Sequence, residues 1–139
     1  MLVTGLIDGP LPPPPDISDP SVTGAEVIFH GRVRNREQGE AIKALYYEAY
    51  QELADRELRA IGAESVAIFS LLDFALHQRI GEVPVGEISL RVVARARHRE
   101  AALKAVAWAV DQLKRRVPVW KWGVRNSGER FPAEGGQTG

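Results

Sequence analysis

Two lysines on either side of a proline are the residues of this sequence best placed to carry out chemistry. Lys114 and Lys121 lie in the stretch LKRRVPVWKWGVRN, residues 113–126. On an unbroken helix the two lysines would stand two turns apart on nearly the same face. Pro118 lies between them, however, and the helix ends at the residue before this proline. The chain can then turn back past the helix end, so the two lysines converge from different elements. A lysine in such a place binds an anion, transfers a proton or attacks a carbonyl group, and the sequence leaves all three open.

Lys114 also has an ordinary structural interpretation. It follows Leu113 at the margin of an apolar stripe that includes Val106 and Val110. A lysine at such a margin usually runs its methylene chain along the apolar surface and places its ammonium group in water. The alternative is an ammonium group held over a pocket at the helix end.

Two further clusters carry positive charge. In RARHRE, residues 95–100, His98 and Arg99 lie where a predicted strand meets a predicted helix. A helix start has free N–H groups and a partial positive charge, so added cations there favour an anion site such as a phosphate site over a solvated loop. In GRVRNRE, residues 31–37, Arg32 and Arg34 share one face of a strand end. That cluster is a weak signal by itself.

Composition limits the classes of protein that fit. The 139 residues suit one domain, and none of the 139 is cysteine, which excludes disulfides and thiolate metal sites. No apolar run is long enough to cross a membrane and no secretory signal opens the chain, so we expect a cytoplasmic protein. Phosphate-loop, dinucleotide-binding, zinc-protease and serine-hydrolase motifs are missing, and the histidines lack metal-type spacing.

Charge is unevenly distributed along the chain. Residues 1–90 contain 7 Lys and Arg against 14 Asp and Glu, whereas residues 91–139 contain 11 against 4. This asymmetry favours a local positive field for an anionic ligand, although the two halves can also neutralise each other in the fold. A non-catalytic module that binds a phosphorylated ligand or RNA remains an alternative to an enzyme. The zero net charge and the lack of an RNA-binding motif count against RNA.

Periodicity predicts an α+β domain with a mainly antiparallel sheet. We expect strands at 1–7, 25–34 and 42–48, of which the last two form a hairpin, a strand that ends at Arg79, and strands at 87–96 and 119–125. In the 87–96 strand we expect Leu90 and Val92 to point inward and Arg91 and Arg95 outward. Helices are predicted at 51–69 and 99–116. The proline-rich segment 8–24 reads as an extended connector.

Five motifs in order resemble one family: AEVIFHGRVRN, YYEAY, RIGEVPVGE, ARHREAA and LKRRVPVWK. Together they resemble MoaE, the catalytic (large) subunit of molybdopterin synthase, over about residues 2–131. The resemblance implies an α/β-hammerhead-like fold with two principal helices. Residues 1–131 would form a single catalytic domain and residues 132–139 a flexible tail.

The resemblance also implies a reaction and its partners. Members of the family transfer sulfur from the thiocarboxylated Gly-Gly terminus of a small ubiquitin-like subunit (MoaD-like) to cyclic pyranopterin monophosphate. This forms the molybdopterin dithiolene in molybdenum cofactor biosynthesis. The step requires no metal and no organic cofactor, and no nucleic acid or membrane takes part. The assembly would be a homodimer within a heterotetramer.

The family's functional positions fall on five residues of this chain. Lys121 and Lys114 would be catalytic, and Arg34, His98 and Arg99 would bind the substrate. Three positions depart from the family pattern. Trp122 and Gly123 replace a basic residue and a glutamate, and Gln78 stands where a histidine is common. The resemblance leaves open which lysine contacts the acyl carbon, whether protomers share a site, and how the two sulfurs are delivered in turn.

Overall fold

The structure is a computed structural model that describes residues 1–133 of the 139-residue chain. Its elements follow one another in the order β1 (Leu2–Asp8), β2 (Ala25–Arg32), β3 (Arg36–Glu37), β4 (Glu40–Ala41), β5 (Ala44–Ala49), α1 (Gln51–Phe69), β6 (Asp73–Pro84), β7 (Ile88–Ala96), α2 (Arg99–Arg116), β8 (Val119–Val124) and β9 (Arg130–Pro132). None of the helices in the described part of the chain is long and apolar enough to cross a membrane.

Seven strands form the main sheet. Its order is β2-β7-β6-β5-β8-β9, and β1 adds to β6 as a parallel neighbour. Every other pairing in this sheet is antiparallel, so the predicted mainly antiparallel α+β fold with two principal helices is confirmed. Strands β3 and β4 form a separate two-stranded hairpin.

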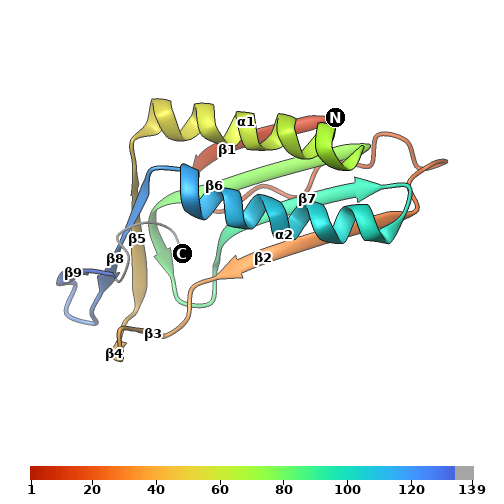
Figure 1. Cartoon of the computed structure of the whole chain (residues 1–139). Coiled ribbons are helices and arrows are strands. Elements are labelled where there is room, and N and C mark those ends of the chain that lie inside the picture. The colour runs from red at the N-terminus through yellow and green to blue at the C-terminus, as the bar shows by residue number, and fades with distance from the viewer. Residues whose placement is uncertain (134–139) are drawn as a thin grey trace.

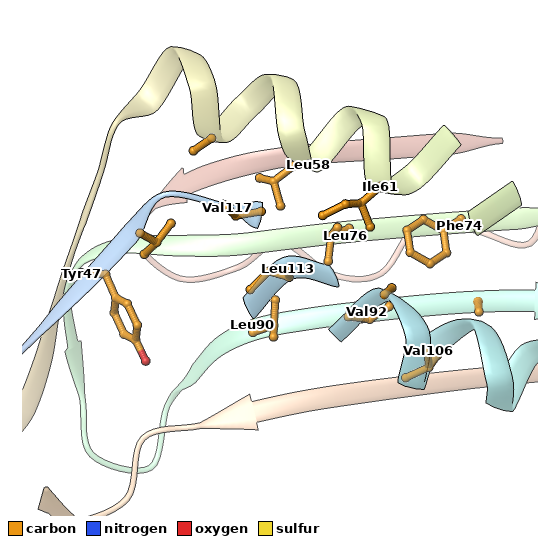
Figure 2. Packing of buried hydrophobic residues seen from close by; sticks show 14 of the residues in the cluster. Tyr47, Leu58, Ile61, Phe74, Leu76, Leu90, Val92, Val106, Leu113 and Val117 are labelled. Carbon is orange, nitrogen blue, oxygen red and sulfur yellow. The ribbon is translucent and has the colours of Figure 1, made fainter. Parts of the chain in front are cut away.

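Both helices cover the same face of the sheet, and the core lies between them and the strands (Figures 1 and 2). The face of α2 that points inward carries alanines between larger residues, which lets the helix approach the sheet closely. Leu113 near its end is fully buried, which contributes about 2 kcal/mol. Other core side chains come from α1, the central strands and the segment after α2: Leu58, Ile61, Phe74, Leu76, Val92 and Val117.

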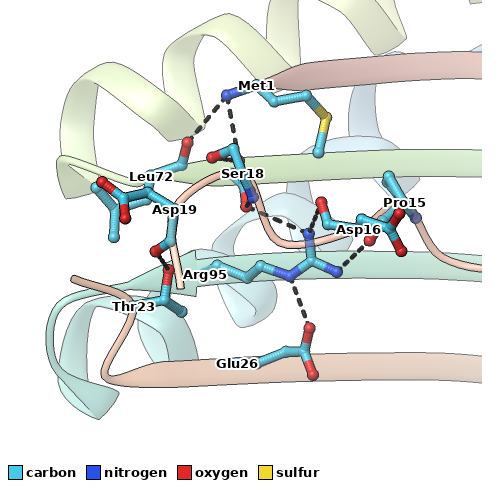
Figure 3. A network of polar contacts seen from close by, with 10 residues as sticks. Met1, Pro15, Asp16, Ser18, Asp19, Thr23, Glu26, Leu72 and Arg95 are labelled. Carbon is cyan, nitrogen blue, oxygen red and sulfur yellow. Dashed lines mark hydrogen bonds and ion pairs between the residues drawn. The ribbon is translucent and has the colours of Figure 1, made fainter. Parts of the chain in front are cut away.

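The opposite face of β7 is covered by the proline-rich connector between β1 and β2. Arg91 and Arg95 alternate with the core residues of β7, as predicted, but they are 8% and 2% exposed and do not face water. Arg91 donates to the carbonyl oxygen of Pro12. Arg95 donates to the carbonyl oxygens of Pro15 and Asp16 (Figure 3). Both arginines thus lie on the outward face of β7, but this face is not open to solvent, because the connector covers it and supplies acceptors for their buried N–H groups.

Arg95 also joins two carboxylates beneath this connector. Its Nη1 lies 3.2 Å from Oδ2 of Asp73, and its Nε lies 2.6 Å from Oε2 of Glu26. Asp73 in turn accepts from the backbone N–H and the hydroxyl of Ser18 at 3.0 and 2.6 Å. A fully buried carboxylate requires several such partners to offset the loss of its hydration, so this network fixes the connector on the sheet.

Two details of the predicted topology differ from the structure. Strands β2 and β5 do not form a hairpin with each other, because β2 pairs with β7 and β5 pairs with β6 and β8. Strand β6 also continues beyond Arg79 as far as Pro84. Of the predicted tail, Pro132 belongs to β9 and the Ala133 N–H donates to the Lys121 carbonyl oxygen at 3.1 Å. The rest of that tail lies outside the described residues.

Candidate functional site

A basic pocket of about 290 Å³ lies where the end of α2 meets strands β2, β5, β7 and β8. We call it the lysine pocket. Its lining combines three kinds of side chain: cations, one carboxylate, and a floor of apolar and hydroxyl groups. These residues are Phe29, Gly31, Arg32, Arg34, Glu37, Leu45, Tyr47, Ser89, Leu90, Val110, Lys114 and Lys121.

Lys114 and Lys121 both line this pocket, although they belong to different elements. Lys114 lies in the last turn of α2, and Lys121 lies in the middle of β8. Between them Val117 leaves helical geometry at φ −87° and ψ 120°, as expected for the residue before Pro118. The structure confirms the prediction that the two lysines converge from different elements on either side of Pro118.

Arg34 reaches the same pocket from the segment that follows β2. The preceding residue, Val33, is buried, and its N–H donates to the Glu87 carbonyl oxygen at 3.1 Å. The Gly86 N–H donates back to the Val33 carbonyl oxygen at 2.8 Å. These bonds fix the backbone beside Arg34, so its exposed side chain starts from a rigid position.

Glu37 is a site residue that the sequence did not predict. It lies on β3 at the pocket wall, and its Oε1 is 3.3 Å from Nζ of Lys121. Both side chains are largely covered, with 12% of Glu37 and 17% of Lys121 exposed. In the sequence Glu37 belongs to a polar turn, and no local pattern shows that this turn folds against β8.

Tyr47 is the second unpredicted residue. It lies directly opposite Lys121 in the pairing of β5 with β8, so both side chains point into the same space. Burial raises the pKa of the Tyr47 phenol, against a smaller lowering by a hydrogen bond with Ser89, and the negative charge of Glu37 raises it further. The phenol therefore stays protonated and can donate a hydrogen bond within the pocket.

The structure places His98 and Arg99 away from this pocket. They lie at the start of α2, where with Gly24 and Glu100 they line a separate hollow. Fifteen residues of helix separate Arg99 from Lys114, which corresponds to roughly 22 Å along the axis. Within one chain, the structure thus brings together Arg34, Lys114 and Lys121 of the five predicted residues, and leaves His98 and Arg99 at the far end of α2.

Comparison with known proteins connects this geometry with one family. The family model described as MoaE protein matches residues 15–116. The chain belongs to the MoaE family. The catalytic subunit of molybdopterin synthase from Pyrococcus abyssi is 46% identical over 109 residues, which cover 78% of this chain and 74% of that protein.

Solved structures have the same fold. The crystal structure of molybdopterin synthase from Staphylococcus aureus matches with a TM-score of 0.80 at 25% identity, covering 94% of this chain and 96% of that chain. A chain from a protein–protein complex of subunits 1 and 2 of molybdopterin-converting factor from Helicobacter pylori matches with a TM-score of 0.76. At 19% identity the second match supports the shared fold alone. The predicted family, fold and enzyme class, a molybdopterin synthase that transfers sulfur, are confirmed.

Two positions that depart from the MoaE pattern have structural partners here. The indole Nε1 of Trp122 donates to Oε1 of Glu48 at 2.6 Å. Gln78 is fully buried, and its Nε2 donates to the carbonyl oxygens of Arg79 and Ser89 at 2.8 and 3.2 Å. Gln78 thus ties β6 to β7 inside the protein, and it does not line the lysine pocket.

The acidic and histidine side chains do not gather into a metal site in the described residues. No group of three or more His, Asp or Glu residues among residues 1–133 is arranged to hold a metal ion. The lysine pocket has one carboxylate among its cations. Its lining is therefore suited to anions, since the ammonium and guanidinium groups of Lys and Arg are donors only.

Proposed function

We propose that the lysine pocket is the active site of this MoaE chain. In it, sulfur would pass from the thiocarboxylated Gly-Gly terminus of a small ubiquitin-like subunit to cyclic pyranopterin monophosphate. The observation that carries this proposal is the convergence of Lys114, Lys121 and Arg34 on one cavity. Both reactants are anionic, one at its thiocarboxylate and one at its phosphate, so a pocket lined by cations attracts each of them.

Lys121 is assigned to the acyl end of the tail. Once the sulfur has bonded to the pterin, water adds to the acyl carbon and negative charge develops on the carbonyl oxygen. The bond between the acyl carbon and sulfur then breaks, and the tail is left as a carboxylate. An ammonium group that is already directed at this oxygen lowers the barrier, because no solvent has to reorganise at that moment. Its place on β8, opposite the buried Tyr47, gives Lys121 a rigid base for this role.

Lys114 and Arg34 are assigned supporting roles at the mouth of the pocket. Both side chains are exposed, so they can reach an incoming ligand before it is desolvated. Arg34 offers a planar fork of donors that matches phosphate oxygens, whereas Lys114 offers a mobile point charge beside Lys121. Either lysine can also transfer a proton.

His98 and Arg99 are assigned to the substrate through a second copy of the chain. Their distance from Lys114 along α2 excludes a shared ligand within one chain. The resemblance implies a homodimer, and β2 lies at one edge of the sheet with Ile28 and Phe29 40% and 37% exposed. An exposed apolar edge strand is a suitable surface for a second copy. One small subunit would dock on each protomer of this dimer.

We further propose that the enzyme works in the cytoplasm. The chain has no cysteine, so its folding depends on no oxidising compartment.

Reconstitution tests the proposed function. The purified chain is mixed with the thiocarboxylated small subunit and cyclic pyranopterin monophosphate, and molybdopterin is measured by chromatography and mass spectrometry. We expect product with the wild-type chain and none when the small subunit ends in an ordinary carboxylate. Lys121→Ala should lose at least about a hundredfold in rate while it still binds the small subunit. Absence of product with the wild-type chain would overturn the proposal.

A further inference from the structure

Glu37 forms an ion pair with the ammonium group of Lys121 at the wall of the lysine pocket. Their ion pair, at 3.3 Å, lies between two side chains that are each more than four-fifths covered. Glu37 is the one acidic residue among the described residues that line the lysine pocket. An ammonium group in this covered position needs an anionic or hydrogen-bonding partner, since leaving it unpaired would cost part of its hydration energy.

Glu37 is carried by a small appendage of the fold. Strands β3 and β4 form a two-stranded hairpin outside the main sheet. Its turn has two consecutive residues in the left-handed region, Gln38 at φ 52° and Gly39 at φ 79°. At its base the Ile42 N–H donates to the Asn35 carbonyl oxygen at 3.1 Å. A hairpin of this size with few backbone bonds can shift without disturbing the core.

A second ion pair ties the same hairpin to the neighbouring loop. Glu40, on β4, accepts from Nη2 of Arg125 at 2.8 Å. Glu40 pairs directly with Glu37 across the hairpin. The hairpin therefore has two glutamates in ion pairs. Glu37 forms a covered pair with a lysine of the pocket, and Glu40 forms a more exposed pair with an arginine outside it.

We infer that Glu37 is a resident counter-ion of Lys121, which the anionic terminus of the small subunit displaces when it enters the pocket. This inference rests on the proposed function. Two carboxyl-type anions cannot approach the same ammonium group in a largely covered site without repelling each other. Entry of the tail therefore requires Glu37 to move away, which its place on a small hairpin outside the main sheet allows. Glu37 is in this sense a positioning residue and does not touch the reacting atoms.

Displacement by an anion has a consequence for selectivity. A tail that ends in an uncharged group does not compete for the ammonium group of Lys121, so the Glu37 ion pair stays in place and does not affect its binding. A tail that ends in a carboxylate or thiocarboxylate replaces one ion pair with another. Glu37 thus weakens the binding of charged tails by the strength of its own ion pair and leaves the binding of uncharged tails unaffected.

The test compares two glutamates and two tails. Binding of the small subunit is measured by calorimetry with its Gly-Gly terminus as a free carboxylate or as a C-terminal amide. The proteins are the wild-type chain, Glu37→Gln and the matched variant Glu40→Gln, which removes the same charge from the same hairpin. We expect Glu37→Gln to bind the carboxylate form about two- to fivefold more tightly, because a competing ion pair is removed.

The amide form and the matched variant show whether tighter binding comes from the lost counter-ion or from a change in the hairpin. We expect Glu37→Gln to bind the amide form as the wild type does, and Glu40→Gln to bind both forms as the wild type does. A merely structural role of Glu37 in the hairpin would change both forms alike. Equal changes for the two tails, or weaker binding of the carboxylate form, would overturn the inference.

Steady-state kinetics gives an independent readout. In sulfur transfer we expect Glu37→Gln to lower KM for the thiocarboxylated subunit while kcat stays within about twofold of the wild type. A fall in kcat with KM unchanged would show that Glu37 acts in the chemical step and would overturn the inference. Failure of the proposed function would appear differently, as an absence of product from the wild-type chain itself.

Discussion

Gly123 and Phe131 face each other directly across the pairing of β8 with β9, and the phenyl ring fills the space that a side chain at position 123 would need. A Cβ atom built on Gly123 would overlap this ring. The ring of Phe131 also contacts Arg125, whose guanidinium carbon lies 4.4 Å from the ring centroid. The departure from the MoaE pattern at Gly123 is thus coupled to the position of Phe131.

Gly123→Ala should therefore destabilise the chain by about 1–3 kcal/mol, as overpacking does in a filled site. Urea unfolding measures this change in the free energy of unfolding. In a Phe131→Ala background the same substitution should cost much less, because the ring that it would strike is gone. If the two substitutions have additive effects on the free energy of unfolding, the Phe131 ring is not the reason that position 123 requires glycine.

Lys114→Ala should reduce molybdopterin formation by about tenfold or more, because it removes one of two ammonium groups beside the reacting anions. Lys104→Ala is the matched control. It lies on the same helix, and its ion pair with Glu100 is exposed to solvent, so its loss should leave the rate unchanged. The rates of molybdopterin formation are measured with saturating small subunit. Equal effects of the two substitutions would show that Lys114 has no role in the active site.

Mixing two inactive variants tests whether protomers share a site. Lys121→Ala and Arg99→Ala are each expected to be inactive as homodimers. In a mixed dimer, one of the two pockets would combine an intact Lys121 with an intact Arg99 from the partner. An equal mixture that exchanges freely should recover about one quarter of the wild-type rate, since half of the dimers are mixed and each has one intact pocket. No recovery would show that Arg99 does not act on the pocket of a second copy.

His77 should make the protein less stable in mild acid. It is 8% exposed on β6, and burial together with the positive charge of Arg91 lowers its pKa below the usual 6.5. The unfolded chain therefore takes up a proton before the folded chain does, and the free energy of unfolding falls as the pH drops below 6.5. Urea unfolding between pH 7.5 and 5.5 should show a smaller fall for His77→Gln than for the wild type, and parallel curves would contradict this.

The helices were predictable from the sequence because their signals are local. Apolar periodicity and Pro118 give the bounds 51–69 and 99–116 that the structure has. The pairing of β2 with β7 was not predictable in this way, because its partner lies about sixty residues along the chain and turn residues favoured a nearer partner. The burial of Arg91 and Arg95 depends on the connector, whose path no periodic pattern reveals.

The same distinction applies to the site. Lys114 and Lys121 were predictable as a pair because the proline between them dictates a local reversal. Glu37 and Tyr47 reach Lys121 only after β5 has paired with β8 and the β3–β4 hairpin has folded over the pocket. The place of Glu37 and Tyr47 in the site depends on long-range contacts, which local sequence patterns do not predict.

Strand β8 has one further property, which concerns light absorption and emission. Two of the three tryptophans of the chain, Trp120 and Trp122, flank Lys121 in the sequence and line a second hollow. Lys121 belongs to the lining of both this hollow and the lysine pocket. The third, Trp108, lies on α2 with its ring centroid 6.0 Å from that of Phe69. Intrinsic fluorescence therefore arises in large part beside the residue that an incoming tail must reach. We expect the arrival of the tail at Lys121 to change this emission, which would allow the event to be followed without attaching a dye.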